Sequence, residues 1–282
     1  MTKFLKIYLF IIILANIFVW FSFFNYLSIF SSRVAFLSVG QGDAELIINK
    51  SGNILIDAGP DASILTALGE NLPLFDRTID LFILTNQDKD HYAGFLKLIE
   101  HYQVRAVMLF KPLAVSQTFS QFLSALEKLK VPVLLAASGA TVELTPQEKI
   151  SVLYPFKNFT SKKTNDFSVI LDFSSFDWRF LFTSDADSNL EKRLMLFQNL
   201  KPYQVLKVAH HGSPTASSLN FLKLIQPLYA VIEVGKNNYG HPSEDVINRL
   251  NSLKSQIFRT DLDGNIKFYL KNGHWQVENK YY

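Results

Sequence analysis

The chain has 282 residues, of which 48% are hydrophobic and none is cysteine. This length suffices for one large domain, the apolar content excludes an intrinsically disordered chain, and the lack of cysteine excludes disulfides and thiolate metal ligands. The first 32 residues carry Lys3, Lys6 and no acidic residue, which leaves 26 of the 28 Lys/Arg and all 25 Asp/Glu in residues 33–282. That near-neutral balance excludes the general positive field of many nucleic-acid-binding domains.

An apolar segment opens the chain. Residues 7–24 read IYLFIIILANIFVWFSFF, and continuing to residue 30 supplies the roughly 20 apolar residues that a helix needs to span a bilayer. A cleaved signal peptide would have a shorter apolar region and a small-residue cleavage site, and no such site precedes Arg33. A buried core helix would carry a polar face, which this segment lacks. We therefore predict an uncleaved transmembrane anchor over residues 1–32 and a single domain over residues 33–282.

The charges that flank the apolar segment predict its orientation. Lys3 and Lys6 precede it, and Arg33 alone follows closely. Basic residues favour the cytoplasmic side of a membrane. We therefore expect a single-pass protein of the cell membrane whose domain is extracytoplasmic.

Strand and helix patterns alternate beyond the anchor. Short apolar or alternating runs predict strands at residues 33–39, 44–48, 53–56, 81–84, 104–109, 167–173, 179–182, 205–208, 229–234 and 256–259. Apolar residues at helical spacing predict helices at residues 62–71, 93–102, 116–130 and 188–200. Asp263-Gly264 and Asn272-Gly273 predict tight turns in a closing β-meander. Each half starts with a hairpin and continues with strand–helix alternation, which predicts an α/β fold with sheets sandwiched by helices.

Two polar clusters directly follow predicted strands. Asp88, Asp90 and His91 lie within four residues, so their carboxylate and imidazole groups can converge on one metal ion. A polar turn whose Asp caps the next helix is the alternative. Asp185 stands at a strand end, where its carboxylate can bridge two metals, whereas Asp187 can simply cap the helix that follows.

Two further clusters contain histidines. His210 and His211 are adjacent at a strand end, so one can bind metal while its neighbour orients substrate. His241 stands just before a helix that Pro242 can start, although a lone His here would more often be a surface residue. Lys236 can hold a phosphate or be a solvated charge.

The four clusters together predict a metal site. Mixed Asp and His ligation suits Zn²⁺ or Mn²⁺, in one or two ions, and a two-metal site activates water and stabilises charge on a phosphoryl or acyl oxygen. The candidate metal ligands are Asp88, Asp90, His91, Asp185, His210 or His211, and His241.

These motifs resemble the metallo-β-lactamase superfamily, in particular the hydrolase domain of the DNA-internalisation competence proteins (ComEC type). The resemblance spans roughly residues 33–270 and implies an αββα sandwich. Its motifs are Phe36–Ala44, Asn53–Gly59, Asn86–His91, Asn165–Val169, Phe182–Asp185, His210–Ser213, Tyr239–Ser243 and Arg259–Gly264.

The resemblance also implies roles for individual residues. Asp90 and His91 are similar to ligands of the second metal, Asp185 to the bridging carboxylate and His241 to the final His ligand. Asp88 stands where a first-site ligand or its substitute belongs. In the double-His motif, one of His210 and His211 contacts metal and the other contacts the scissile phosphate. We expect Asp90, His211 and Lys236 to act in catalysis, and Asp57 to be a structural Asp beneath the metal loop.

The chain departs from the family pattern in two respects. Asn86 replaces the first His of the superfamily motif, and a neutral amide is a poorer ligand; Asn165 stands near another His position, although the competence branch tends to have Asn there. Two ions, one ion, or a degenerate inactive domain therefore stay open. The competence proteins also carry many membrane helices that form a DNA channel, whereas one span is predicted here, so we expect a separate channel protein as partner.

Three functions follow from these expectations. The first is a metal-dependent phosphodiesterase, a nuclease acting on DNA at the membrane surface during competence. The second is a hydrolase of a small ester, lactone or phosphoester, which the near-neutral domain favours because extended DNA binding usually needs a basic groove. The third is a metal-poor, non-catalytic module that assists a separate DNA channel.

Overall fold

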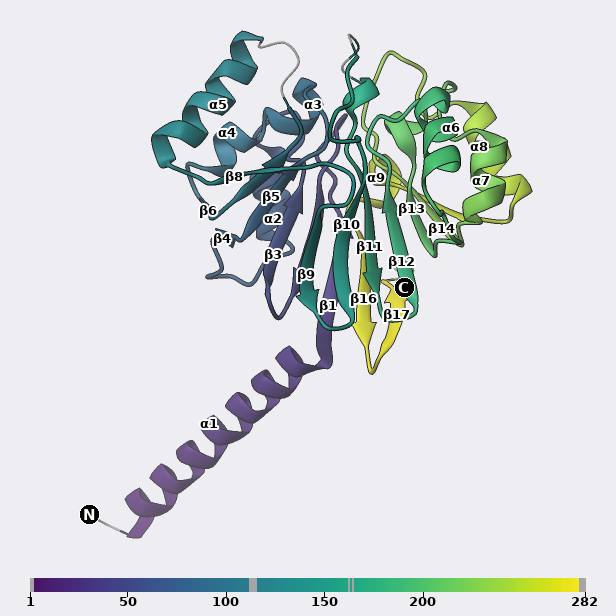
Figure 1. Ribbon diagram of the computed structural model, residues 1–282. Coiled ribbons are helices and arrows are strands. Elements are labelled where there is room, and N and C mark those ends of the chain that lie inside the picture. Colours follow the sequence, from purple (N-terminus) through teal and green to yellow (C-terminus); the bar gives the residue numbers. More distant parts are fainter. Residues whose placement is uncertain (1–2, 112–115, 162, 164, 279–282) are drawn as a thin grey trace.

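Two β-sheets pack face to face, and helices cover the outer face of each sheet (Figure 1). The structure is a computed structural model that describes residues 3–111, 116–161, 163 and 165–278. Its four layers run helix, sheet, sheet, helix, so the α/β sandwich predicted from the sequence is confirmed.

The first sheet has eight strands and lies under the helices of the first half of the chain. Its strands in spatial order are β17 (His274–Val277), β16 (Ile266–Lys271), β1 (Phe30–Phe36), β2 (Glu45–Asn49), β3 (Gly52–Ile56), β5 (Leu81–Leu84), β7 (Val107–Leu109) and β8 (Val133–Leu135). The helices on its outer side are α2 (Ser63–Gly69), α3 (Lys89–Tyr92), α4 (Phe95–Leu98) and α5 (Gln117–Leu129). A separate two-stranded sheet joins β4 (Thr78–Ile79) and β6 (Gln103–Val104).

The second sheet has seven strands and lies under the later helices. Its strands in spatial order are β15 (Gln256–Arg259), β14 (Tyr229–Ile232), β13 (Val205–Lys207), β12 (Trp178–Phe182), β11 (Ile170–Ser175), β10 (Glu148–Tyr154) and β9 (Thr141–Thr145). The helices on its outer side are α6 (Ser188–Phe197), α7 (Leu219–Ile225) and α8 (Glu244–Ser252). The short helices are α9 (Thr260–Asp263), η1 (Asn165–Phe167) and η2 (Ala209–Gly212).

Strand periodicity divides the apolar residues among three cores. In β1, Val34 and Phe36 belong to the core between the sheets, whereas Ala35 belongs to the core beneath α2, α4 and α5. Successive side chains of a strand point to opposite faces, so a strand covered on both sides reads as a continuous apolar run. A third core lies beneath α6, α7 and α8.

Helix α1 (Lys3–Ile29) extends away from the sandwich (Figure 1). Within the described residues, it is the one helix long and apolar enough, by length and composition, to cross a membrane. The candidate span Lys3–Phe21 is entirely exposed, which rules out the alternative of a buried core helix. The helix ends at Ile29 and β1 begins at Phe30, so no linker separates them.

Several predicted elements differ in the structure. The strand predicted at 33–39 begins earlier, at Phe30, and the helix predicted at 93–102 starts four residues earlier and breaks between α3 and α4. Strands β8, β9 and β10 were not predicted. The predicted turn at Asn272-Gly273 is confirmed, because it joins the antiparallel strands β16 and β17. The predicted turn at Asp263-Gly264 does not join neighbouring strands, because α9 ends at Asp263 and the strands on either side of it belong to different sheets.

The core between the sheets should carry much of the stability. Phe180 is fully buried, and its ring centroid lies 4.9 Å from that of Trp275 and 5.8 Å from that of Phe268. We expect Phe180→Ala to lower the free energy of unfolding by about 3–5 kcal/mol, because it leaves a cavity among rigid rings. Urea unfolding of the full chain in detergent measures this. Leu196→Ala, at a side chain that is 77% exposed, is the control and should change the value by less than about 0.5 kcal/mol.

Candidate metal centre

The candidate ligands lie in loops that follow β5, β12, β13 and β14. The last three strands run parallel, so their carboxyl ends meet at one edge of the second sheet. Strand β5 belongs to the first sheet. The site therefore lies where the two sheets meet, and each sheet contributes part of it.

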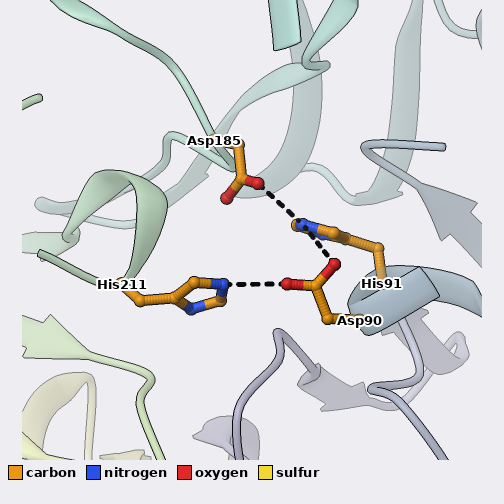
Figure 2. A group of neighbouring side chains, drawn as sticks. All are labelled: Asp90, His91, Asp185 and His211. Carbon is orange, nitrogen blue, oxygen red and sulfur yellow. Dashed lines mark hydrogen bonds and ion pairs between the residues drawn. The ribbon is translucent and has the colours of Figure 1, made fainter. Parts of the chain in front are cut away.

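Four of the predicted residues come together, as Figure 2 shows: Asp90, His91, Asp185 and His211. One ligand atom from each lies within 4.8 Å of the others. The Nε2 atom of His91 is 3.2 Å from Oδ2 of Asp185, and Nε2 of His211 is 3.2 Å from Oδ2 of Asp90. Three of these side chains are buried and Asp90 is partly exposed. Two carboxylates and two imidazoles are a donor set that suits Zn²⁺ or Mn²⁺.

Buried acceptors orient both imidazoles. Asp57 Oδ2 accepts a hydrogen bond from Nδ1 of His91 at 2.7 Å, and Asp57 itself accepts from the Thr85 amide at 2.7 Å. The Glu233 carbonyl accepts from Nδ1 of His211 at 2.8 Å. With both Nδ1 atoms engaged, both Nε2 atoms face the cluster, which is the usual arrangement of metal-ligating histidines. Asp57 therefore lies beneath His91, as the resemblance implied.

Protons on the two imidazoles offset the negative charges of the carboxylates in the cluster. Burial alone would raise the pKa of Asp185, but the charge of His91 outweighs burial and holds that pKa well below its ordinary value. Burial would lower the pKa of His91, yet Asp185 and Asp57 raise it well above the ordinary value. Burial would also lower the pKa of His211, but the charge of Asp43 outweighs burial and raises that pKa to about 10. Without a cation, two imidazolium groups neutralise the carboxylates, and a divalent ion can take over that charge.

Buried polar atoms without hydrogen-bond partners gather around the same place. Among the described residues they include Asn86 Oδ1, Asp185 Oδ1, His210 Nδ1 and His241 Nδ1. The two carboxyl or amide oxygens carry lone pairs, and each imidazole nitrogen does so in one of its two tautomers; burying such an atom unpaired is costly. The residues therefore fit a bound cation, which would satisfy some of these atoms.

The remaining predicted residues lie beside the cluster. Asp88 precedes α3, but its side chain makes no capping hydrogen bond, so the helix-cap alternative does not apply to it. The ring centroids of His210 and His241 are 5.8 Å apart. Lys236 is exposed. In the described part of the chain, none of these four contributes an atom to the group of four candidate ligands, whereas Asp187 does cap α6 through the Asn189 and Leu190 amides.

A pair of amide side chains, Asn86 and Asn165, lies beside the cluster. Asn86 Nδ2 is 3.3 Å from Asn165 Oδ1 and 3.4 Å from Asp185 Oδ2. Asn86 is buried, so these contacts hold it against the cluster. Amide oxygens suit hard cations such as Mn²⁺ better than Zn²⁺.

The backbone of the site loops is strained. Asp57, Ser184, His210 and His211 all have left-handed φ values, from 47° to 53°. Such values are uncommon for residues other than glycine and persist where surrounding structure imposes them. The His210 amide donates to the Ser184 carbonyl at 2.9 Å, which joins the loops after β12 and β13.

A buried charge network beneath the cluster was not predicted. The Lys207 ammonium pairs with Asp43, and both side chains are fully buried. Asp43 Oδ1 is also 3.3 Å from Nδ1 of His211. The carboxyl groups of Glu45 and Glu233 are buried in the same interior, where burial, and then the charge of Glu45, raises the pKa of Glu233. A signal for these residues does exist in the sequence, since Lys207 and Glu233 each interrupt an otherwise apolar strand, where charged residues are rarely buried without a partner.

Comparisons with curated proteins find competence proteins. The chain is 28% identical over 260 residues to ComE operon protein 3 of Bacillus subtilis and 30% identical over 246 residues to competence protein ComA of Neisseria gonorrhoeae. These alignments cover 85% and 86% of this chain but 33% of each relative. The chain thus spans about a third of the length of these relatives. No protein-family profile matches the chain.

Solved structures decide the fold. The metallo-β-lactamase-fold protein YhfI of Bacillus subtilis superposes with a TM-score of 0.57 over 88% of this chain and 100% of its own, at 11% identity. This chain has the metallo-β-lactamase fold. Zn²⁺-bound PqqB of Methylobacterium extorquens superposes with a TM-score of 0.52 over 83% of this chain and 99% of its own, at 14% identity. At these identities the likeness concerns the fold, and the relation to the competence proteins comes from sequence.

The Glu45–Glu233 pair should make stability depend on pH. Burial, followed by the charge of Asp43, raises the pKa of Glu45 from its ordinary value of 4.5 to about 8, and burial raises the pKa of Glu233 well above its ordinary value. The folded state holds these protons more tightly, so the stabilisation is full below 4.5 and declines as the pH rises toward 8, by up to about 1.4 kcal/mol per unit for each group. Urea unfolding with a chelator across this window measures the decline.

Replacing one carboxyl group tests the cause of this decline. Glu233→Gln keeps the size of the side chain and an oxygen that can accept from the Ala44 amide, and it removes a titrating group, so we expect a shallower decline. The site histidines titrate in both proteins, so the difference isolates the pair. Identical pH curves would show that the pair does not titrate in this window.

Metal binding should depend on Asp185 and not on its neighbour Asp187. Added Zn²⁺ or Mn²⁺ should stabilise the chelator-stripped full chain, by about 2.7 kcal/mol at a free metal concentration 100 times Kd. Asp185→Asn should lose most of this gain, because it removes a ligand charge. Asp187→Asn keeps a good helix cap and should retain the gain. Thermal unfolding with and without metal measures both, and an unchanged gain in Asp185→Asn would contradict the ligand assignment.

Proposed function

We propose that the chain is a metal-dependent hydrolase of phosphodiesters that acts on DNA at the membrane surface. The converging side chains of Asp90, His91, Asp185 and His211 carry this proposal, because they form a buried, oriented donor set for a divalent cation. Similarity to competence proteins supports a role in DNA uptake. We further propose that residues 1–32 anchor the protein and that residues 33–282 form the hydrolase domain.

The side chains of the site have separate tasks in this proposal. Bound Zn²⁺ or Mn²⁺ supplies a Lewis acid and lowers the pKa of water that it holds. Asp90, His91, Asp185 and His211 would hold the ion, with both Nε2 atoms already turned toward it. The adjacent histidines therefore exchange their expected roles. His211, which we expected to act in catalysis, is proposed as a metal ligand, and His210 would face the substrate together with His241.

The charge of the site supports one tightly held ion. Asp90 and Asp185 together balance one divalent cation, Asp43 is neutralised by Lys207, and Asn86 adds no charge. A second ion would have to rely on Asp88, on the amide pair and on the histidines beside the cluster. We therefore infer one high-affinity position and a weaker second position that favours Mn²⁺ over Zn²⁺.

The loop after β14 supports a nucleic-acid substrate. Tyr239 is 77% exposed, and its ring centroid lies 5.8 Å from that of His241. Lys236 is exposed in the same loop. An exposed aromatic face and an ammonium beside a metal centre suit a base and its phosphate, without a basic field over the whole domain. Similarity to competence proteins supports a separate channel protein as the partner that would carry the DNA across the membrane.

A non-catalytic module is the second candidate. The contact between Asn86 and Asn165 favours it, because two neutral amides weaken the first metal position. In that case the domain would bind DNA or a channel protein without cleaving either. Metal content separates the two candidates, since the hydrolase needs a stoichiometric ion.

Cleavage assays test the proposed activity. The full chain in detergent is stripped with a chelator, reloaded separately with Mn²⁺ and Zn²⁺, and incubated with labelled single- and double-stranded DNA and with small phosphodiester and ester substrates. We expect metal-dependent DNA cleavage, and a loss of at least about 100-fold in the Asp90→Ala, His91→Ala double variant. The Asp187→Asn variant is the matched control and should keep full activity.

The pattern of cleavage among these substrates distinguishes the candidate functions. Cleavage of small esters alone would replace DNA as the substrate. A folded, metal-loaded protein that cleaves no substrate would contradict the proposed hydrolase, and a folded protein that retains no metal and cleaves no substrate would support the non-catalytic module.

A further inference from the structure

The end of the sandwich opposite the metal centre is where α1 joins. Strand β1 starts at Phe30, directly after α1, and leads to the loop that carries Asp43 beneath the cluster. Phe30 pairs with Lys271 of β16, and Ser32 pairs with Asn49 of β2. The turns of the β2–β3 and β16–β17 hairpins therefore lie at the end where α1 enters, below the sheets in Figure 1. We call this the anchor end.

Two further hairpin turns reach the anchor end. The Ser51 hydroxyl donates to the Leu144 carbonyl, which places the β9–β10 turn beside the β2–β3 turn. The Phe176 amide donates to the Gln147 carbonyl at 3.1 Å, which adds the β11–β12 turn. Phe176 is 51% exposed in that turn.

The loop between α2 and β4 also lies at the anchor end. The Arg33 guanidinium donates to the Asn71 carbonyl at 3.2 Å, so the loop touches β1 four residues after α1 ends. The Asn53 amide group donates to Asp76 at 2.8 Å, which holds the other end of the loop against the start of β3. Both ends of the loop are thus fastened to the first sheet.

The middle of this loop exposes two large apolar side chains. Leu74 is 74% exposed and Phe75 is 91% exposed, the highest value for a large apolar residue among the described side chains. Exposed apolar groups of this kind mark contact surfaces when they cluster at one place. The neighbouring acidic groups are engaged, since Asp76 accepts from Asn53 and Asp80 pairs with Arg105. The basic side chains of Lys50 and Lys271 are exposed at the same end.

We propose that Leu74, Phe75 and Phe176 form a lipid-contacting surface that seats the anchor end on the bilayer. The inference rests on the proposed membrane anchoring by α1. A bilayer is the partner that this position favours, because the apolar helix enters at this end without a linker. Leu and Phe side chains bury themselves at the headgroup–acyl boundary, while Lys side chains reach anionic headgroups. Together with α1, this surface restrains how the domain tilts on the membrane.

Site-directed spin labelling tests the contact. The chain has no cysteine, so a single introduced cysteine takes the label alone. The full-length variants Phe75→Cys, Leu262→Cys and Ile12→Cys are reconstituted in phosphatidylcholine–phosphatidylglycerol liposomes. Leu262 is the matched control, since it is 71% exposed in α9, which follows the carboxyl end of β15. Ile12 reports on α1. Collision of each label with oxygen, which concentrates in lipid, is compared with collision with a water-soluble nickel chelate.

We expect the oxygen-to-nickel collision ratio at position 75 to be several-fold higher than at position 262 and to approach that at position 12. Because Phe75 is almost fully exposed, its replacement removes little packing. Position 12 in lipid with position 75 in water would overturn the lipid-contacting surface while the anchor stands. Water-like values at both positions would overturn the anchor and the surface together.

Discussion

The ion pair between Lys207 and Asp43 joins the parts of the metal centre. Lys207 belongs to the second sheet and Asp43 to a loop of the first, and both are fully buried. The Lys207 ammonium also donates to the Ser184 carbonyl at 3.3 Å, next to Asp185, while the Asp43 amide donates to the Asp90 carbonyl at 3.2 Å. One ammonium thus links three of the loops that carry ligands. Removing one partner of a buried pair typically costs about 3–5 kcal/mol, so the loss of either Lys207 or Asp43 should destabilise the contact between the sheets.

The fold and the outline of the site could be predicted from the sequence. Polar residues directly after apolar strands indicated four loops, and parallel strands bring such loops to one edge. Asp90, His91 and Asp185 do converge, because their loops follow β5 and β12 where the two sheets meet. Strand β10 was missed although Ile150 and Val152 alternate with exposed or half-buried residues, because its first residue is a buried Glu148 that reads as polar.

The finer geometry depends on properties that no sequence pattern carries. His210 and His211 are adjacent and chemically identical, and their left-handed backbone decides which ring turns toward Asp90. That conformation is imposed by packing of the neighbouring loops, because neither residue prefers it. The contact between Asn86 and Asn165 likewise depends on how two segments 79 residues apart meet.

The direct junction between α1 and β1 fixes the distance between the end of α1 and the candidate metal centre. Strand β1 has seven residues, which at about 3.3 Å per residue makes a rigid spacer of about 23 Å. Under the proposed anchoring, in which α1 spans the bilayer, the candidate metal centre lies at the far end of that spacer from the lipid. The phosphodiesters of membrane lipids then lie too low to reach the ligands without leaving the bilayer. In the proposed function the site is therefore placed for a nucleic-acid substrate that arrives from the water phase and not for lipid headgroups.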